Sequence, residues 1–221
     1  MSTRINHNIL SMTAQRNIRT TQSDLNRAVN RLSSGLRINN AFEDPAGLAI
    51  SERFRAQIAS MEEAERNADY DINLIDTAEG ALSIIDEMLI RMRALAVQAA
   101  NGALEEQDRA VLDVEFQQLK SEITRIASKT TYNNKVLLDG GFSSDGIRFH
   151  IGPQADDGYI VKFNDMTASG LGLTSAELTT IDASRAAITN LDTAIESKDT
   201  ERTRLGSSVK RLQHTIANLL I

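Results

Sequence analysis

The longest regular pattern in the chain is an apolar repeat, at alternating steps of three and four residues, that covers residues 45–100. This spacing places the apolar side chains on one face of an α-helix, and its persistence over about six heptads is typical of coiled-coil-like packing. A helix of this length extends roughly 84 Å at 1.5 Å per residue, so the pattern predicts a rod-like domain. The repeat consists of Phe54, Ile58, Met61, Ala68, Ile72, Ile75, Leu82, Ile85, Leu89, Met92, Ala96 and Ala99.

A second helix is predicted near the N-terminus, at about residues 6–32. Its apolar stripe is thin and consists of Ile18, Thr21, Leu25, Ala28 and Leu32. Such a helix is marginal alone in water, so we expect it to pack against a partner. A polar joint separates it from the long helix: Gly35 suits the left-handed residue after a last turn, Asp44 can cap the next helix, and Pro45 suits a first helical position.

Two more amphipathic helices are predicted at about residues 105–128 and 178–219. The break at Asn101-Gly102 suggests that the first of these forms an antiparallel hairpin with the long helix. The apolar repeat of the second has a 3-4 spacing throughout, although Lys198 and Arg202 fill two of its positions. Long helices with such stripes bury them most readily against one another.

Between residues 130 and 172 the period changes from helical to two, and glycines cluster. Alternating apolar residues in 147–151 and 159–163, with Asp157-Gly158 between them, predict a β-hairpin that packs on the helices. The predicted fold class is therefore mainly α: an elongated bundle of long coiled-coil-like helices with a small β-hairpin.

Composition narrows the function to association. The 221 residues include no cysteine and no tryptophan and carry a net charge of −6, which argues against nucleic acid as the main partner. Residues 1–42 hold six arginines and one acid, so this arm is basic, and it could bind RNA, an anionic surface or an acidic helix. The simpler interpretation is a helix whose arginines cover its polar side. No segment approaches the roughly 20 apolar residues of a membrane span, so we expect no membrane partner.

We find no pattern that predicts an enzyme. The three histidines, His7, His150 and His214, are far apart and form no metal-binding pair, and the P-loop and nucleophile-elbow motifs are absent. His150 alternates outward from the predicted strand, which favours a solvated side chain. We therefore predict no catalytic, metal or cofactor site.

Three sequence words carry a specific resemblance. The first is RLSSGLRIN at residues 31–39, followed by DPAGLAISERF at 44–54. The second is RMRALAVQAAN at 91–101, and the third is RTRLGSSVKRLQHTIANL at 202–219. In this order they resemble the signature of bacterial flagellin, the subunit of the flagellar filament. The resemblance covers nearly the whole chain.

The resemblance implies an extracellular structural subunit that assembles with other flagellin subunits into a helical homopolymer. Residues 1–44 would be the N-terminal inner-core helix and its joint, and residues 45–221 the rod-like outer-core domain. It also implies passage through the type III flagellar export apparatus. The absence of a long apolar run in the first 16 residues fits export without a cleaved signal peptide.

The resemblance further implies recognition of the monomer by a Toll-like receptor of animal cells, at positions that match Arg91, Leu95 and Glu115. Arg91 and Leu95 are four residues apart and share a helical face, and Leu95 is off the repeat described above, so we expect it to point outward. The alternative is that Arg91 and Glu115 form an ordinary salt bridge and that Leu95 flanks the core.

The family pattern continues beyond a segment like the third word, so the resemblance implies that the C-terminal inner-core helix is lacking from this sequence. Two other interpretations stay open. One is a hook–filament junction protein, which shares the helical core, and the other is a soluble binding module that does not polymerise.

Overall fold

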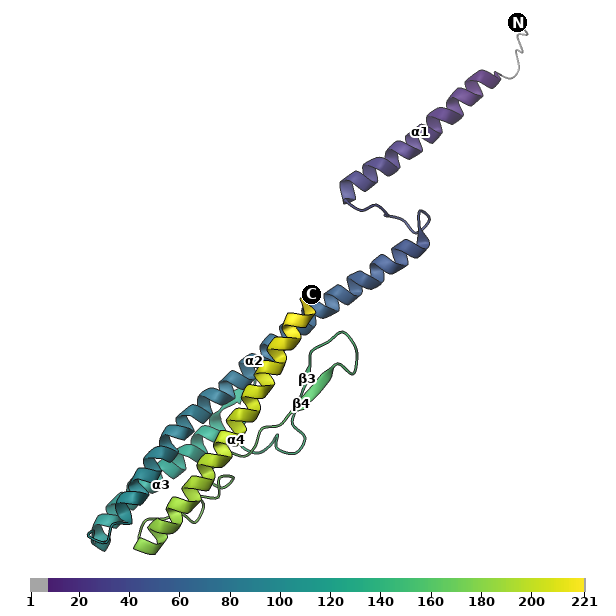
Figure 1. Ribbon diagram of the computed structural model, residues 1–221. Helices are drawn as coiled ribbons and strands as arrows, with labels where there is room; N and C mark the ends of the chain where they lie inside the picture. Colours follow the sequence, from purple (N-terminus) through teal and green to yellow (C-terminus); the bar gives the residue numbers. More distant parts are fainter. Residues whose placement is uncertain (1–7, 221) are drawn as a thin grey trace. The chain divides into compact units, whose positions relative to one another are not determined.

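The computed structural model describes residues 8–220, and Figure 1 shows the helices and strands that they form. The chain divides into two compact units, Met1–Ala59 and Ser60–Ile221, which are described separately below. Four helices and two small antiparallel hairpins make up the described residues. The mainly α fold class with a small β-hairpin is thus confirmed.

The first unit contains α1, Ile9–Ser34, and the start of α2, which spans Pro45–Ala99. The Asn8 side chain accepts a hydrogen bond from the backbone N–H of Ser11 at 3.1 Å and caps the start of α1. Gly35 ends α1 in the left-handed conformation, at φ +70°, where glycine has no Cβ penalty. The predicted start of this helix, Asn6, lies outside the described residues.

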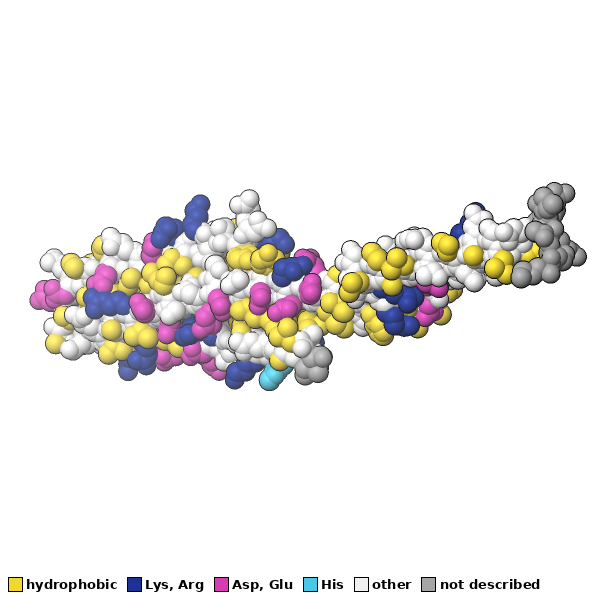
Figure 2. Space-filling model, turned by 90° about the horizontal axis from the view of Figure 1, so that it is seen from above, with side chains coloured by type: hydrophobic (Ala, Val, Ile, Leu, Met, Phe, Trp, Pro, Cys, Tyr) yellow, Lys and Arg dark blue, Asp and Glu magenta, His cyan; other side chains and the backbone are white. Residues whose placement is uncertain are grey.

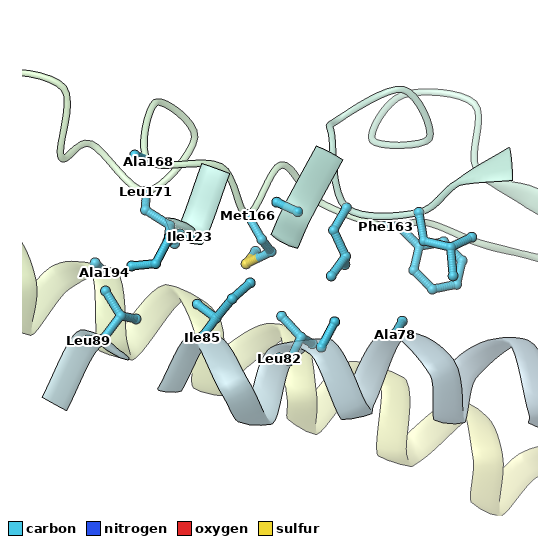
Figure 3. Packing of buried hydrophobic residues seen from close by; sticks show 14 of the residues in the cluster. Ala78, Leu82, Ile85, Leu89, Ile123, Phe163, Met166, Ala168, Leu171 and Ala194 are labelled. Atoms are coloured by element: carbon cyan, nitrogen blue, oxygen red, sulfur yellow. The ribbon is translucent and has the colours of Figure 1, made fainter. Parts of the chain in front are cut away.

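The second unit is a bundle of three helices, and its core runs along the apolar face of α2 from Ala64 to Ala99. α3 spans Glu106–Lys129 and α4 spans Ile181–Leu219, and both lie alongside α2 (Figure 1). Figure 3 shows one side of this core, where α2, α3, α4 and the segment after the larger hairpin meet. The buried side chains labelled there are Ala78, Leu82, Ile85, Leu89, Ile123, Phe163, Met166, Ala168, Leu171 and Ala194.

The turn between α2 and α3 is held by a buried arginine. Arg109 is 7% exposed, and its guanidinium donates to the carbonyl oxygen of Asn101 at 3.1 Å and to that of Ala99 at 3.4 Å. The last carbonyls of a helix lack intrahelical partners, so Arg109 satisfies part of the C-terminus of α2. The antiparallel hairpin predicted from Asn101-Gly102 is thereby fixed.

The predicted β-hairpin is present as β3, Ile147–His150, and β4, Gly158–Val161. The strands pair antiparallel with Phe149 opposite Tyr159, and the rings of these two residues meet edge to face with centroids 5.8 Å apart. Phe149, Val161 and Phe163 are buried in the core of the unit, whereas His150 is exposed as predicted. Alternation of period two therefore placed the correct side chains inward.

A second, smaller hairpin was not predicted. β1, Thr131–Tyr132, pairs with β2, Lys135–Val136, around a two-residue turn. Asn133 and Asn134 take positive φ values of 48° and 62°, which is the conformation that a type I′ turn requires. The Asn-Asn pair is the signal that could have revealed this turn.

α4 buries part of the line of residues that the sequence predicted, together with residues beside that line. It begins at Ile181 rather than near Leu178, because Thr180 caps it through a hydrogen bond from the N–H of Ala183 at 3.1 Å. Of the predicted repeat, Leu191, Leu205 and Leu212 are fully buried, whereas Ile188, Ile195, Val209 and Ile216 are only partly buried. The fully buried line consists of Ser184, Ala187, Leu191, Ala194, Lys198, Glu201, Leu205 and Leu212.

Candidate functional site

The predicted assembly stripe of α1 is exposed along its whole length. Ile18 is 67% exposed, Leu25 is 54% and Leu32 is 87%, and Ala28 between them is also exposed. No residue of α1 is buried. Figure 2 shows apolar side chains at the surface of the first unit, next to the grey N-terminal residues. A helix with its apolar face in water carries the kind of surface that marks a protein–protein interaction site.

The joint between α1 and α2 is an ordered structure. Asp44 accepts a hydrogen bond from the N–H of Gly47 at 2.9 Å, so it caps α2 as predicted, and Pro45 is the first residue of that helix. Gly47 lies close to Asp44 and Ile38, so a Cβ at this position would have to displace the ends of their side chains. Arg31 of α1 lies 3.5 Å from Glu43 of the joint. The predicted cap residues Gly35, Asp44 and Pro45 therefore all take the predicted positions.

The second candidate site is the exposed face that α2 and α3 share. Two nitrogens of the Arg91 guanidinium donate hydrogen bonds to the Glu115 carboxylate. The distance is 2.7 Å from Nε to Oε1 and 3.0 Å from Nη2 to Oε2. This hydrogen bond holds the pKa of Glu115 below its ordinary value, and it raises the pKa of Arg91. The two side chains form the salt bridge of the alternative interpretation, and both remain about half exposed.

The expectation that Leu95 points outward is wrong. Leu95 is 1% exposed and belongs to the core. The apolar face of α2 is wider than one repeat, because α2 packs against α3 on one side and against α4 on the other, so both Leu95 and Ala96 are covered. The exposed apolar side chains of this stretch are Ile90, at 57%, and Val97, at 50%. The structure thus brings Arg91 and Glu115 together but removes Leu95 from their surface.

On its other side α2 carries a comparable ion pair. Arg93 Nε lies 2.7 Å from Asp192 Oδ1 of α4, and both side chains are about half exposed. Arg91 and Arg93 therefore tie α2 to its two neighbours in similar ways. On the face seen in Figure 2, acidic and basic side chains are interspersed with apolar ones over the second unit.

Within residues 8–220, no group of three histidine or acidic side chains is arranged to hold a metal ion. In that same part of the chain, no helix combines the length and apolar character needed to cross a bilayer. The described surface has a hollow of about 210 Å³ at the joint of the first unit and one of about 700 Å³ along α4, between Asp192 and Arg204.

Comparison with known proteins decides the family. Residues 5–143 match the family described as the bacterial flagellin N-terminal helical region. The chain is 42% identical over 219 residues to a flagellin of Halalkalibacterium halodurans, in an alignment that covers 97% of this chain and 79% of that protein. This chain belongs to the flagellin family. Members of this family are structural subunits of the bacterial flagellar filament, which is extracellular.

Solved structures agree with this assignment. The crystal structure of Bacillus cereus flagellin is 36% identical, with a TM-score of 0.62, and covers 70% of this chain and 88% of that one. A protein described as flagellar hook-associated, from Vibrio parahaemolyticus, has a TM-score of 0.65 at 14% identity, over 81% of this chain and 94% of that one. The second likeness shows the shared fold alone. Sequence identity therefore favours flagellin over the hook–filament junction alternative.

Proposed function

We propose that this flagellin family member polymerises with copies of itself through the apolar stripe of α1, with residues 1–44 as the inner-core helix and joint and residues 45–221 as the outer core. The observation that carries the proposal is the exposure of the whole stripe. Each bulky aliphatic side chain that leaves water contributes roughly 1.5–3 kcal/mol, so the stripe favours association strongly. Contacts that repeat head to tail without closing produce helical filaments. We also propose passage through the type III export apparatus without a cleaved signal peptide, which the polar N-terminal segment favours.

Leu25→Asp is expected to abolish growth of filaments, because it puts a charge in the centre of the exposed stripe. Leu25 is 54% exposed and makes no part of the core of the second unit, so the fold of that unit is expected to survive. The measurement is electron microscopy of the purified chain mixed with sheared filament seeds.

The matched control is Asn30→Asp, which introduces the same charge on the opposite face of α1. Filaments from Asn30→Asp but not from Leu25→Asp support the proposal. Equal growth from both variants contradicts it, and so does circular dichroism showing that Leu25→Asp unfolds the second unit.

We further propose that the free monomer is recognised by a Toll-like receptor through the surface around Arg91 and Glu115. This proposal rests on the exposed guanidinium of Arg91, held in place by Glu115, with the half-exposed Ile90 next to it in α2. An arginine beside apolar side chains is a common centre of binding energy in interfaces. Leu95 does not take part directly, since it is buried.

Arg91→Ala is expected to weaken receptor activation by about tenfold, the loss expected when a moderate interface hot spot is truncated. Leu95→Ala is a poorer test, because it would open a cavity in the core whether or not the receptor reads this surface. The measurement is a reporter-cell dose–response curve with purified monomer.

Arg93→Ala is the control, since it removes a similar half-exposed ion pair between α2 and α4. If Arg91→Ala and Arg93→Ala shift the dose–response curve equally, or neither shifts it, the receptor does not read the Arg91 surface.

A further inference from the structure

The buried line of α4 contains two consecutive charged positions. Between Ala194 and Leu205 the only fully buried residues are Lys198, at 2% exposure, and Glu201, at 0%. Elsewhere in its middle part this line is apolar, with Leu191, Ala194 and Leu205 fully buried. For about three turns, therefore, the fully buried positions of α4 are charged, although Ile195 beside them is partly buried against the core.

Lys198 reaches across the bundle to α2. Its Nζ lies 2.5 Å from Asp86 Oδ1, and the neighbouring Asp199 on α4 lies 2.6 Å from the same nitrogen. Asp86 is only 26% exposed and has a second cation nearby, Arg202 Nη1 at 4.0 Å. Arg202 in turn donates to Glu79 of α2 at 2.7 Å. The pairs join the two helices at one definite axial position.

The carboxylate of Glu201 finds its hydrogen-bond partners on α4 itself and on the segment after β4, not on α2. Both of its carboxylate oxygens accept from Arg204 Nη2, at 2.6 and 2.7 Å, and Oε1 also faces the N–H of Asn164 at 3.3 Å. Arg204 donates to the carbonyl oxygen of Lys162 as well. Glu201 therefore belongs to the contact with the segment after β4, while Lys198 is the buried charge that faces α2.

A buried ion pair is a weak source of stability, because removing the charges from water costs about as much as their attraction returns. A charged or polar residue at one position of an apolar helical repeat instead specifies the register of the helices at a cost in stability. The apolar part of this repeat does not specify register well by itself. Leu205 and Leu212 are seven residues apart, so a slip of one heptad places one leucine where the other was.

We propose that Lys198 is the residue that specifies the axial register of α4 against α2. In a one-heptad slip Lys198 would occupy the place of Leu205, towards Glu79, or that of Leu191, towards Arg93, and in both cases the pair with Asp86 is lost. The slip towards Arg93 leaves the ammonium buried without a carboxylate, and the slip towards Glu79 displaces Arg202 from that acid, so either one raises the free energy of the slipped arrangement. The register of α4 is a property of the free subunit, so its test needs neither filament nor receptor.

The test uses the absence of cysteine from the chain. Ala94→Cys on α2 and Lys210→Cys on α4 are exposed positions for two spin labels. Since Asp86 lies opposite Lys198 in the antiparallel pair, the labelled positions are about 30 Å apart along the bundle at 1.5 Å per residue. A slip of one heptad changes that separation by about 10 Å, which double electron–electron resonance resolves.

With Lys198 present we expect one narrow distance distribution. Lys198→Met, which keeps the length of the side chain without its charge, is expected to add a second population displaced by about 10 Å. Its midpoint of chemical denaturation is expected to fall, because Asp86 loses its ammonium partner and keeps only the longer contact with Arg202. Lys198→Arg keeps the charge and is expected to restore the single distance.

A single, unshifted distance in Lys198→Met overturns the proposal, because the apolar residues would then suffice. A second distance in Lys198→Arg overturns it too, since charge would not be the determinant. If Lys198→Met does not fold, the double variant Lys198→Met/Asp86→Leu removes both partners and is measured in the same way. Failure of the double variant to fold also overturns the proposal, because the pair would then be needed for folding itself.

Discussion

Replacing Phe116 with alanine is expected to lower the free energy of unfolding of the second unit by about 3–5 kcal/mol. Phe116 is fully buried and is among the largest buried side chains of the core. α3 buries few residues, namely Arg109, Phe116, Ile123 and Ala127, so its attachment to the bundle depends on this ring. The measurement is a denaturant titration followed by circular dichroism.

Val114→Ala is the matched control on the same helix. Val114 is 59% exposed, so its truncation is expected to change the free energy of unfolding by less than about 0.5 kcal/mol. Equal losses for Phe116→Ala and Val114→Ala would contradict the core assigned here, and so would a loss below about 1 kcal/mol for Phe116→Ala.

Asp71→Asn is expected to stabilise the second unit at pH 8 and to have little effect at pH 4. Asp71 lies on α2, and its Oδ2 atom is buried. Among residues 8–220 this atom has no hydrogen-bond partner. Burial raises the pKa of Asp71 from 3.8 to about 7. Asparagine keeps the shape of the side chain but cannot ionise.

The direction of the effect follows from proton binding. Between pH 3.8 and about 7 the folded chain holds a proton on Asp71 that the unfolded chain has released, so the stability of the parent chain falls as pH rises through this window. A shift of about three units would correspond to about 4 kcal/mol. Asp71 is only half buried, so solvent screens the charge, and we expect a gain of about 1–2 kcal/mol for the variant at pH 8.

The measurement is the free energy of unfolding of both proteins between pH 4 and pH 8. Asp69→Asn is the control, because Asp69 is exposed on the same helix. A stability difference between Asp71→Asn and the parent that stays constant with pH would contradict the raised pKa of Asp71.

The α2 helix shows how far the burial of its apolar residues could be predicted from the sequence. The apolar repeat identified Leu82, Ile85, Leu89 and Met92 as core residues, and all four are fully buried. The same repeat continues into Phe54 and Ile58, yet these are 59% and 56% exposed. Periodicity shows which face of a helix is apolar, but only the presence of neighbouring helices decides how far along the helix that face is covered.

Leu95 and the buried line of α4 illustrate the same limit across the helix. A single 3-4 repeat describes contact with one partner, whereas α2 contacts two, so its buried face is wide enough to include Leu95. In α4, the observed line shares Leu191, Leu205 and Leu212 with the predicted repeat, but it also includes Glu201, and it buries Lys198 and Glu201 despite their charge. Hydrophobicity alone assigns such residues to the surface. The ion pair of Lys198 joins it to Asp86, 112 positions away, whereas Glu201 pairs with Arg204 three positions along the same helix.

What the sequence by itself determined is local: the helices, their caps at Gly35, Asp44 and Pro45, the alternation of the larger hairpin, and the words that show the flagellin family. These features depend on residues within one or two turns of each other. Only the tertiary structure decided that Arg91 pairs with Glu115, that Leu95 is buried, and that Lys198 faces Asp86. Each of these depends on the register and rotation of one helix against another, and side chains far apart in the chain set both.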